Sequence, residues 1–210
     1  MIIRLHILSR FRRNTSGAVA LEFSLVMLLC IALTLGALDG AFAYFQWLRT
    51  DKGLQEGIRM AVVSDYVLTD LGSFDCYNAT SADYGQSCAG STVKIPTANC
   101  ISDGSAVSCS CVASCSAAVS MGNVSQAAFD AIVARIQVYN PDLQATNLSI
   151  SYADVGLGFA GRPGGAVPAV TLSIRNFPYD FFVLNNLFQL PQINMPAMTT
   201  TLTGEDQASG

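Results

Sequence analysis

The chain has 210 residues, of which 51% are hydrophobic and 12% are charged, with a net charge of −4. These values lie between those of a soluble domain and a membrane protein, and they fit one membrane segment followed by one domain of modest size. After residue 17 the chain has seven basic against fifteen acidic residues, which excludes the clustered positive charge that nucleic-acid binding needs.

A basic segment precedes a long apolar stretch. Residues 18–48 are almost wholly apolar, with Glu22 and Asp39 as their charged members. About 20 helical residues cross a bilayer, so this stretch predicts one transmembrane helix. The excess of arginine before it places the N-terminus in the cytoplasm and the rest of the chain on the other side of the membrane. These arginines are Arg4, Arg10, Arg12 and Arg13.

Helical spacing continues beyond the apolar stretch. Apolar residues recur at intervals of three or four without a proline, and they predict one continuous helix over residues 18–64, about 70 Å long. Residues 72–124 are rich in serine, glycine, alanine and cysteine, which predicts an irregular loop. A second helix is expected over residues 125–139, with Ser125 capping its start and Asn140-Pro141 following its end.

Alternating apolar and polar residues near the C-terminus predict β-strands. One such stretch is centred on Ile150, a second contains Leu172, and a third covers residues 198–202, after an apolar excursion at 177–190. The expected fold class is therefore α+β. A long N-terminal transmembrane helix should precede a small domain with a helix, a short antiparallel sheet and a disulfide-stapled loop.

Six of the seven cysteines lie between residues 76 and 115. The seventh, Cys30, lies in the apolar stretch, where a free thiol behaves as a small apolar side chain. An even number of cysteines in an exported domain predicts disulfides, with fifteen possible connectivities. The C-x-C-x3-C spacing of the last three leaves zinc as the alternative, although C-x2-C pairs and histidine partners are missing. The six are Cys76, Cys88, Cys100, Cys109, Cys111 and Cys115.

The start of the apolar stretch carries a distinctive pattern. Gly17 follows the basic segment, Ala18 opens the apolar residues, and Glu22 and Phe23 come one helical turn later. This pattern resembles the processing site of class III prepilins, which implies that a peptidase cuts between Gly17 and Ala18. A carboxylate near the edge of an apolar helix costs about 2–4 kcal/mol unless it is paired. In staggered helix packing, Glu22 of one chain can meet the new Ala18 amine of a neighbour.

The resemblance extends along the helix. After Glu22-Phe23 come an apolar run, Gly36-Ala37-Leu38-Asp39-Gly40, an aromatic stretch at residues 43–45, and a polar stretch leading into Gly57-Ile58-Arg59-Met60-Ala61. In this order, residues 12–63 resemble the TadE-like family, the pseudopilins of the tight-adherence (Tad/Flp) pilus machinery. The length of the chain favours this family over the longer TadG-like proteins. The cysteine-rich region departs from the short loops of the family.

The resemblance implies a minor pilin or pseudopilin of a Tad-type, type IV-like pilus assembly and secretion system, acting structurally through packing of its N-terminal helix. Residues 1–17 would be a cytoplasmic leader that is cleaved off, 18–64 the transmembrane and extended helix, and 65–210 a periplasmic α+β domain with a cysteine-rich loop at 76–115. The expected partners are other pilins, the prepilin peptidase, the assembly platform of the bacterial inner membrane, and the lipid bilayer. A place in an extracellular pilus is a further outcome that the resemblance allows.

The sequence offers no enzyme signature. The one histidine, His6, lies in the leader, and nucleophile elbows, phosphate loops and dinucleotide fingerprints are missing, so no catalytic residue, metal or cofactor is expected. Two alternatives stay open. Ala41-Phe42-Ala43 fits the cleavage site of an ordinary signal peptide, which would release a secreted protein. An uncleaved helix would instead anchor an ectodomain that binds a ligand or catalyses a reaction.

Overall fold

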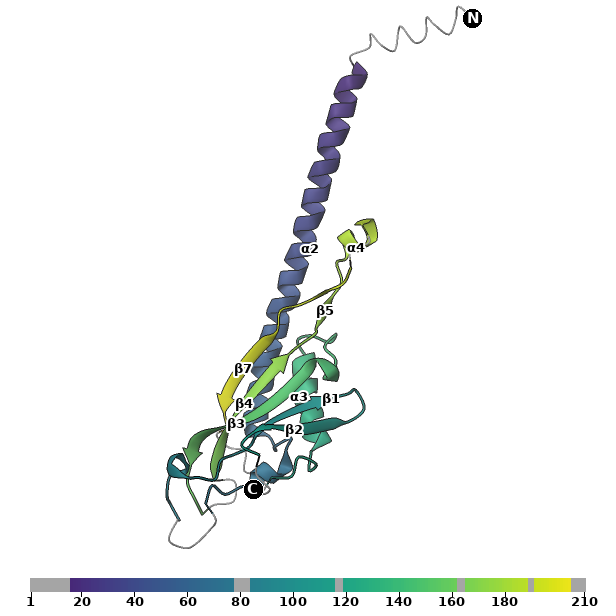
Figure 1. Cartoon of the computed structure of the whole chain (residues 1–210). Helices are drawn as coiled ribbons and strands as arrows, with labels where there is room; N and C mark the ends of the chain where they lie inside the picture. Colours follow the sequence, from purple (N-terminus) through teal and green to yellow (C-terminus); the bar gives the residue numbers. More distant parts are fainter. Residues whose placement is uncertain (1–15, 78–83, 116–118, 162–164, 189–190, 205–210) are drawn as a thin grey trace, which may run out of the picture. The chain divides into compact units, whose positions relative to one another are not determined.

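The computed structural model describes residues 16–77, 84–115, 119–161, 165–188 and 191–204 (Figure 1). The chain divides into two compact units, of which the first comprises the chain up to Tyr44 with Asp180–Gln192, and the second comprises Phe45–Tyr179 with Ile193–Gly210. The elements are α2 (Ser16–Val63), η1 (Thr69–Ser73), η2 (Cys88–Gly90), β1 (Thr97–Ser102), β2 (Val107–Ala113), α3 (Gln126–Gln137), η3 (Ala145–Asn147), β3 (Leu148–Gly158), β4 (Ala166–Ile174), β5 (Pro178–Tyr179), α4 (Val183–Phe188), β6 (Ile193–Asn194) and β7 (Met198–Thr203).

The continuous N-terminal helix predicted from the sequence is confirmed. Helix α2 runs unbroken for 48 residues, because the stretch lacks proline and is rich in residues that favour helix. The second predicted helix is α3, and Ser125 caps it by accepting a hydrogen bond from the Ala128 amide at 3.2 Å. This side-chain oxygen satisfies one of the amide groups that the first helical turn leaves without an intrahelical acceptor.

The sheet of the second unit is antiparallel, in the order β2-β1-β3-β4-β7. Strands β3, β4 and β7 correspond to the three stretches in which alternation predicted strands, and the α+β prediction is confirmed. A short ribbon of β5 and β6 lies outside this sheet. In Figure 1, α3 and the C-terminal part of α2 both lie behind the sheet, so the two helices cover one of its faces.

The core lies between this face and the two helices. Ile150 of β3 and Leu172 of β4 are opposite each other and fully buried. Tyr152 is also buried, and its hydroxyl accepts a hydrogen bond from the Val67 amide at 3.1 Å. Its ring contacts that of Tyr66, with centroids 5.9 Å apart. Burial raises the pKa of Tyr66 to about 12 and raises that of Tyr152 as well.

The opposite face of the sheet is built from small hydroxyl side chains. Ser149 stands opposite Ser173, and Thr171 stands opposite Thr201. The two threonine hydroxyls are hydrogen-bonded at 2.7 Å. Since successive side chains of a strand point to opposite faces, the same alternation that builds the core places these hydroxyl side chains on the other face, where Ser149 and Ser173 are buried.

The predicted loop at residues 72–124 also contains two strands, β1 and β2, which the sequence analysis missed. In β1, Ala98 and Cys100 point into the core and are fully buried, and Asn99 between them is not. The alternation is present, but its inward positions carry alanine and cysteine rather than large aliphatic residues. Tertiary burial and the disulfide between Cys100 and Cys109 therefore stabilise strands that residue propensity does not indicate.

Two glycines allow α2 and α3 to approach closely. A Cβ atom at Gly57 would lie 2.6 Å from Ile136 Cγ1 and 2.9 Å from Ile136 Cδ1, and one at Gly53 would lie 3.0 Å from the Ile136 carbonyl oxygen. Ile136 is fully buried, so its side chain cannot move into solvent to make room. The glycine and alanine at positions 57 and 61 therefore have a packing cause. Gly57 makes room for α3, and Ala61 is buried on the same helix.

Polar contacts surround this close approach. The Arg49 guanidinium donates to the Tyr139 carbonyl at 2.8 Å, and the Asn140 amide donates to the buried Thr50 hydroxyl at 2.7 Å. Glu56 forms ion pairs within α2 and also with α3. The Lys52 ammonium, which is hydrogen-bonded to Glu56, lowers the pKa of that carboxyl, and two arginines contribute. The three cationic partners are Lys52, Arg59 and Arg135, at 3.2, 3.5 and 3.4 Å.

We expect Gly57→Ala to lower the free energy of unfolding by about 1–3 kcal/mol, because the added methyl group overpacks against Ile136. Gly40→Ala is the matched control, since a Cβ there meets nothing within 4 Å and alanine favours helix. Urea unfolding of the full chain in detergent, followed by near-UV circular dichroism, measures both. If steric overlap is the cause, Gly57→Ala combined with Ile136→Ala should lose less stability than the sum of the single changes.

Candidate functional site

The N-terminal half of α2 exposes large apolar side chains. Val19, Leu21, Phe23 and Leu28 are each 65–72% exposed. Residues 17–63 form a helix long and apolar enough to cross a membrane, and none of its most apolar 18-residue stretch is buried. Apolar surface of this extent is normally covered by lipid or by other helices. It is therefore the leading candidate for a functional surface in the described part of the chain.

The residues of the predicted cleavage and assembly site lie at the start of this surface. Gly17 and Ala18 are in the first turn of α2, and Glu22 and Phe23 follow one turn later, all of them exposed. Helical residues four apart are neighbours, so Ala18 and Glu22 share one side of the helix. The predicted leader, with its arginines and His6, falls at residues 1–17 and lies almost wholly outside the described residues.

Asp39 is the second carboxylate of the apolar stretch, and the first unit buries it completely. Its Oδ2 atom accepts a hydrogen bond from the Leu184 amide at 2.7 Å, and both of its oxygens lie 3.1 Å from the Val183 amide. These amides belong to the first turn of α4. A carboxylate at a helix N-terminus satisfies free amide groups and interacts favourably with the helix dipole.

Sequence reasoning did not assign this role to Asp39. The signals were present separately, as a charged residue within an apolar stretch and as an apolar excursion at 177–190. They lie more than 140 residues apart, and short-range periodicity carries no information about a contact at that separation. The tertiary structure brings them together within one compact unit.

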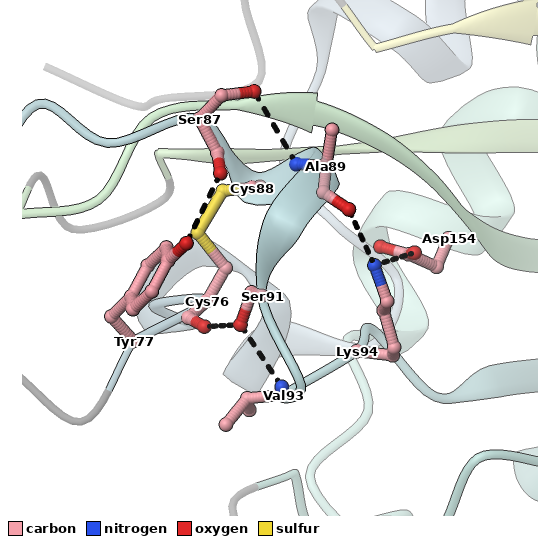
Figure 2. Close-up of polar contacts among 9 residues, drawn as sticks. All are labelled: Cys76, Tyr77, Ser87, Cys88, Ala89, Ser91, Val93, Lys94 and Asp154. Atoms are coloured by element: carbon pink, nitrogen blue, oxygen red, sulfur yellow. Dashed lines mark hydrogen bonds and ion pairs between the residues drawn. A yellow bond between two sulfur atoms is a disulfide. The ribbon is translucent and has the colours of Figure 1, made fainter.

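A loop closed by a disulfide lies beside the C-terminal part of β3 (Figure 2). The Cys76–Cys88 disulfide joins the chain before η2 to its first residue. Ser91 donates from its hydroxyl to the Cys76 carbonyl and accepts from the Val93 amide at 2.9 Å. Lys94 then connects this loop to the sheet, with its ammonium 3.3 Å from the Ala89 carbonyl and 3.6 Å from Asp154. These contacts fix the shape of the loop.

All six cysteines of the outer segment form disulfides, which excludes the zinc alternative. Besides Cys76–Cys88, the pairs are Cys100–Cys109, opposite each other on β1 and β2, and Cys111–Cys115 at the end of β2. Cys30 is a free thiol and is exposed on α2. Within the described ranges, no group of three or more His, Cys, Asp or Glu residues is arranged to hold a metal ion.

Two aspartates of the second unit organise turns. The Asn123 side-chain amide and the Ser120 backbone amide donate to Asp70 and lower its pKa. The amides of Ala106 and Ser105 likewise lower the pKa of Asp103 to about 2, in the turn between β1 and β2. Asp70 therefore links η1 to the distant turn at residues 120–123, and Asp103 stabilises its own turn through local hydrogen bonds.

The family comparison agrees with the geometry of α2. The model of the family described as TadE-like protein matches residues 17–59. The N-terminal helix is TadE-like. The likeness covers the N-terminal helix alone, and it is to a family of structural components of the Tad pilus. No curated protein and no solved structure matches the chain at a significant level.

The TadE-like stretch combines the exposed and the packed parts of α2. It begins at Gly17, contains Glu22 and Asp39, and ends at Arg59, just after the two glycines that contact α3. The disulfide-bonded domain lies beyond the matched residues. The family likeness therefore covers the membrane-type helix and its attachment to the domain, and it does not extend to the sheet and the stapled loop.

We expect thiol labelling of the denatured, unreduced protein to modify Cys30 alone, because the other six cysteines are paired. Prior reduction should expose six further thiols. Mass spectrometry after alkylation counts them, and proteolysis before reduction identifies the three pairs. Four or more reactive thiols without reduction would contradict the disulfides and would indicate a reducing compartment.

Proposed function

We propose that this protein is a minor pilin or pseudopilin of a Tad-type (Flp, type IV-like) pilus assembly and secretion system. It acts structurally, through side-by-side packing of its N-terminal helix with the helices of other pilins. The observation that carries the proposal is the exposed apolar surface of α2 within the TadE-like stretch, with Glu22 near its start. Such a surface fits a lipid bilayer before assembly and neighbouring helices after it.

In this proposal, the charge of Glu22 favours helices that are assembled with neighbours over a helix that is alone in the membrane. In an isolated membrane helix, a carboxylate near the hydrocarbon edge costs about 2–4 kcal/mol unless it is paired. Cleavage after Gly17 would create an ammonium at Ala18, one turn away on the same side of the helix. A neighbouring subunit displaced along the helix axis can then pair its amine with this carboxylate. The charge thus favours the assembled helix over the solitary one.

The membrane topology follows from the same proposed function. Residues 1–17 are a cytoplasmic leader, residues 18–64 are the transmembrane and extended helix, and residues 65–210 form the periplasmic domain. Three disulfides suit an oxidising compartment such as the periplasm. Besides other pilins, the partners are the prepilin peptidase, the inner-membrane assembly platform and the bilayer. The domain would become exposed outside the cell if the subunit enters a pilus.

Processing tests the proposal directly. Co-expression with an active class III prepilin peptidase should shorten the chain by 17 residues, and N-terminal sequencing should begin at Ala18. Gly17→Leu should block cleavage, because a peptidase of this kind accepts a small residue before the scissile bond. The matched control is Gly36→Leu, also on α2 with nothing within 4 Å of a Cβ, and it should be processed normally.

Other N-termini would contradict the proposal in different ways. A chain that begins at Tyr44 would be the product of a signal peptidase and would be secreted without its helix. A chain that keeps Met1 in the presence of the active peptidase would be a permanently anchored ectodomain. The processing experiment therefore separates the pilin-type function from both alternatives.

Glu22→Gln tests the pairing separately from the processing. The substitution keeps the size of the side chain and removes its charge, so we expect normal membrane insertion and cleavage but a loss of pilus output or of crosslinked subunit pairs. Glu56→Gln serves as the control, because Glu56 already pairs within its own chain. Normal assembly of Glu22→Gln would show that the carboxylate does not pair with a neighbouring amine.

A further inference from the structure

The first unit presents a small apolar surface, the α4 tip, which we define as residues 181–185. The tip begins with two phenylalanines followed by valine and leucine, and it contains no charged residue. Phe182 is 74% exposed, one of the most exposed large apolar side chains outside the N-terminal part of α2. Phe181, Val183 and Leu184 beside it are half-exposed, so the apolar residues of the tip are contiguous, and contiguous exposed apolar surface marks sites that bind a membrane or another protein.

The α4 tip is attached to the membrane-type helix and not to the sheet. Residues 180–192 belong to the same compact unit as α2 up to Tyr44. Asp39 makes the attachment, since it accepts hydrogen bonds from the Val183 and Leu184 amides. Asp39 is fully buried, and these two amides donate hydrogen bonds to its carboxylate in place of water.

The rise of the helix gives the depth in the membrane at which Asp39 holds the α4 tip. The apolar stretch begins at Ala18, and about 20 helical residues cross the hydrocarbon of a bilayer. Asp39 therefore lies at the outer boundary of the hydrocarbon, and the backbone of the α4 tip lies beside it. Tyr44 and Trp47 follow within about two and a half turns of the same helix. Tyrosine and tryptophan are typical of the interfacial layer, where a polar atom meets the headgroups and the ring meets the acyl chains.

We propose that the α4 tip binds the outer interfacial layer of the membrane beside the transmembrane helix, and that Asp39 positions it there. The partner is the lipid surface itself, because the tip is apolar, uncharged and held at the level where the hydrocarbon ends. The buried Asp39 carboxylate satisfies the free amides of α4, which would otherwise be costly to place among lipids. The tip would act as a second, shallow membrane contact of each subunit. This inference rests on the part of the proposed function in which α2 crosses a membrane.

Fluorescence quenching in bilayers tests the proposal. The full-length protein carrying Cys30→Ala and Phe182→Cys is labelled with NBD without reduction and reconstituted into phosphatidylcholine–phosphatidylglycerol vesicles. Vesicles with a nitroxide at a shallow acyl position should quench roughly half of the NBD intensity, because interfacial helices bury about 5–10 Å into the headgroup boundary. A deep nitroxide should quench it less. One reactive thiol per unreduced chain verifies that the disulfides are intact.

Labels at two other positions provide reference values for the quenching. Phe159→Cys replaces a phenylalanine of the second unit that is also largely exposed, at 61%, and its label should not be quenched by either lipid. Leu28→Cys lies midway along the apolar part of α2, and its label should be quenched most by the deep nitroxide. Adding Asp39→Ala to Phe182→Cys should reduce the shallow quenching toward the Phe159→Cys level, without changing the Leu28→Cys result.

The outcomes separate this inference from the proposed function. If Leu28→Cys shows deep quenching while Phe182→Cys behaves like Phe159→Cys, α2 crosses the membrane and the tip does not bind lipid. If neither Leu28→Cys nor Phe182→Cys is quenched, the membrane-spanning helix itself is contradicted. Shielding of the Phe182→Cys label from iodide that rises with protein density, without lipid quenching, would overturn the proposal in favour of a contact between subunits. If the Phe182→Cys label is still fully quenched by the shallow nitroxide when Asp39→Ala is added, Asp39 does not position the tip.

Discussion

The close approach of α3 to two glycines of α2 is the contact on which the second unit depends. With no side chain at Gly53 and Gly57, the buried Ile136 packs directly against the α2 backbone, and Leu172 of the sheet reaches the same place. This contact makes the C-terminal part of a membrane-type helix into a component of a globular core. Arginine, threonine and glutamate on the flanks of the glycines then form hydrogen bonds and an ion pair to α3 and to the two residues Tyr139 and Asn140 that follow it, which fixes the position of α3 along α2.

The two carboxylates in the apolar part of α2 differ in how their charges are compensated. Asp39 is satisfied within its own chain by the amides of α4, and it is fully buried. Glu22 stays exposed on the apolar surface, and in the proposed assembly the Ala18 amine of a neighbouring subunit compensates its charge. A carboxylate in an apolar environment is costly unless it is paired or hydrogen-bonded. One acidic residue therefore stabilises the fold of the subunit, and the other provides the energetic basis for the proposed assembly.

Much of the fold could be predicted from short-range patterns. Helix α2, the cap of α3 at Ser125, and the strands around Ile150 and Leu172 follow from periodicity and capping, because these signals depend on neighbouring residues. Strand β1 could not be predicted this way, since Ala98 and Cys100 are small and gain their inward role from burial and a cross-strand disulfide. The disulfide connectivity was likewise undetermined, because six cysteines allow fifteen pairings and their spacing does not choose among them.

The sequence by itself determined the membrane-type helix, the glycine–glutamate pattern at its start and the α+β class, because each of these features depends on residues that are close together along the chain. Only the tertiary structure decided that Asp39 caps α4, that Gly57 receives Ile136, and that a region rich in serine and cysteine supplies two strands of the sheet. These features join residues that are tens to more than a hundred positions apart. Their energies come from burial and from hydrogen bonds that exist only once the chain has folded, and local sequence patterns do not encode them.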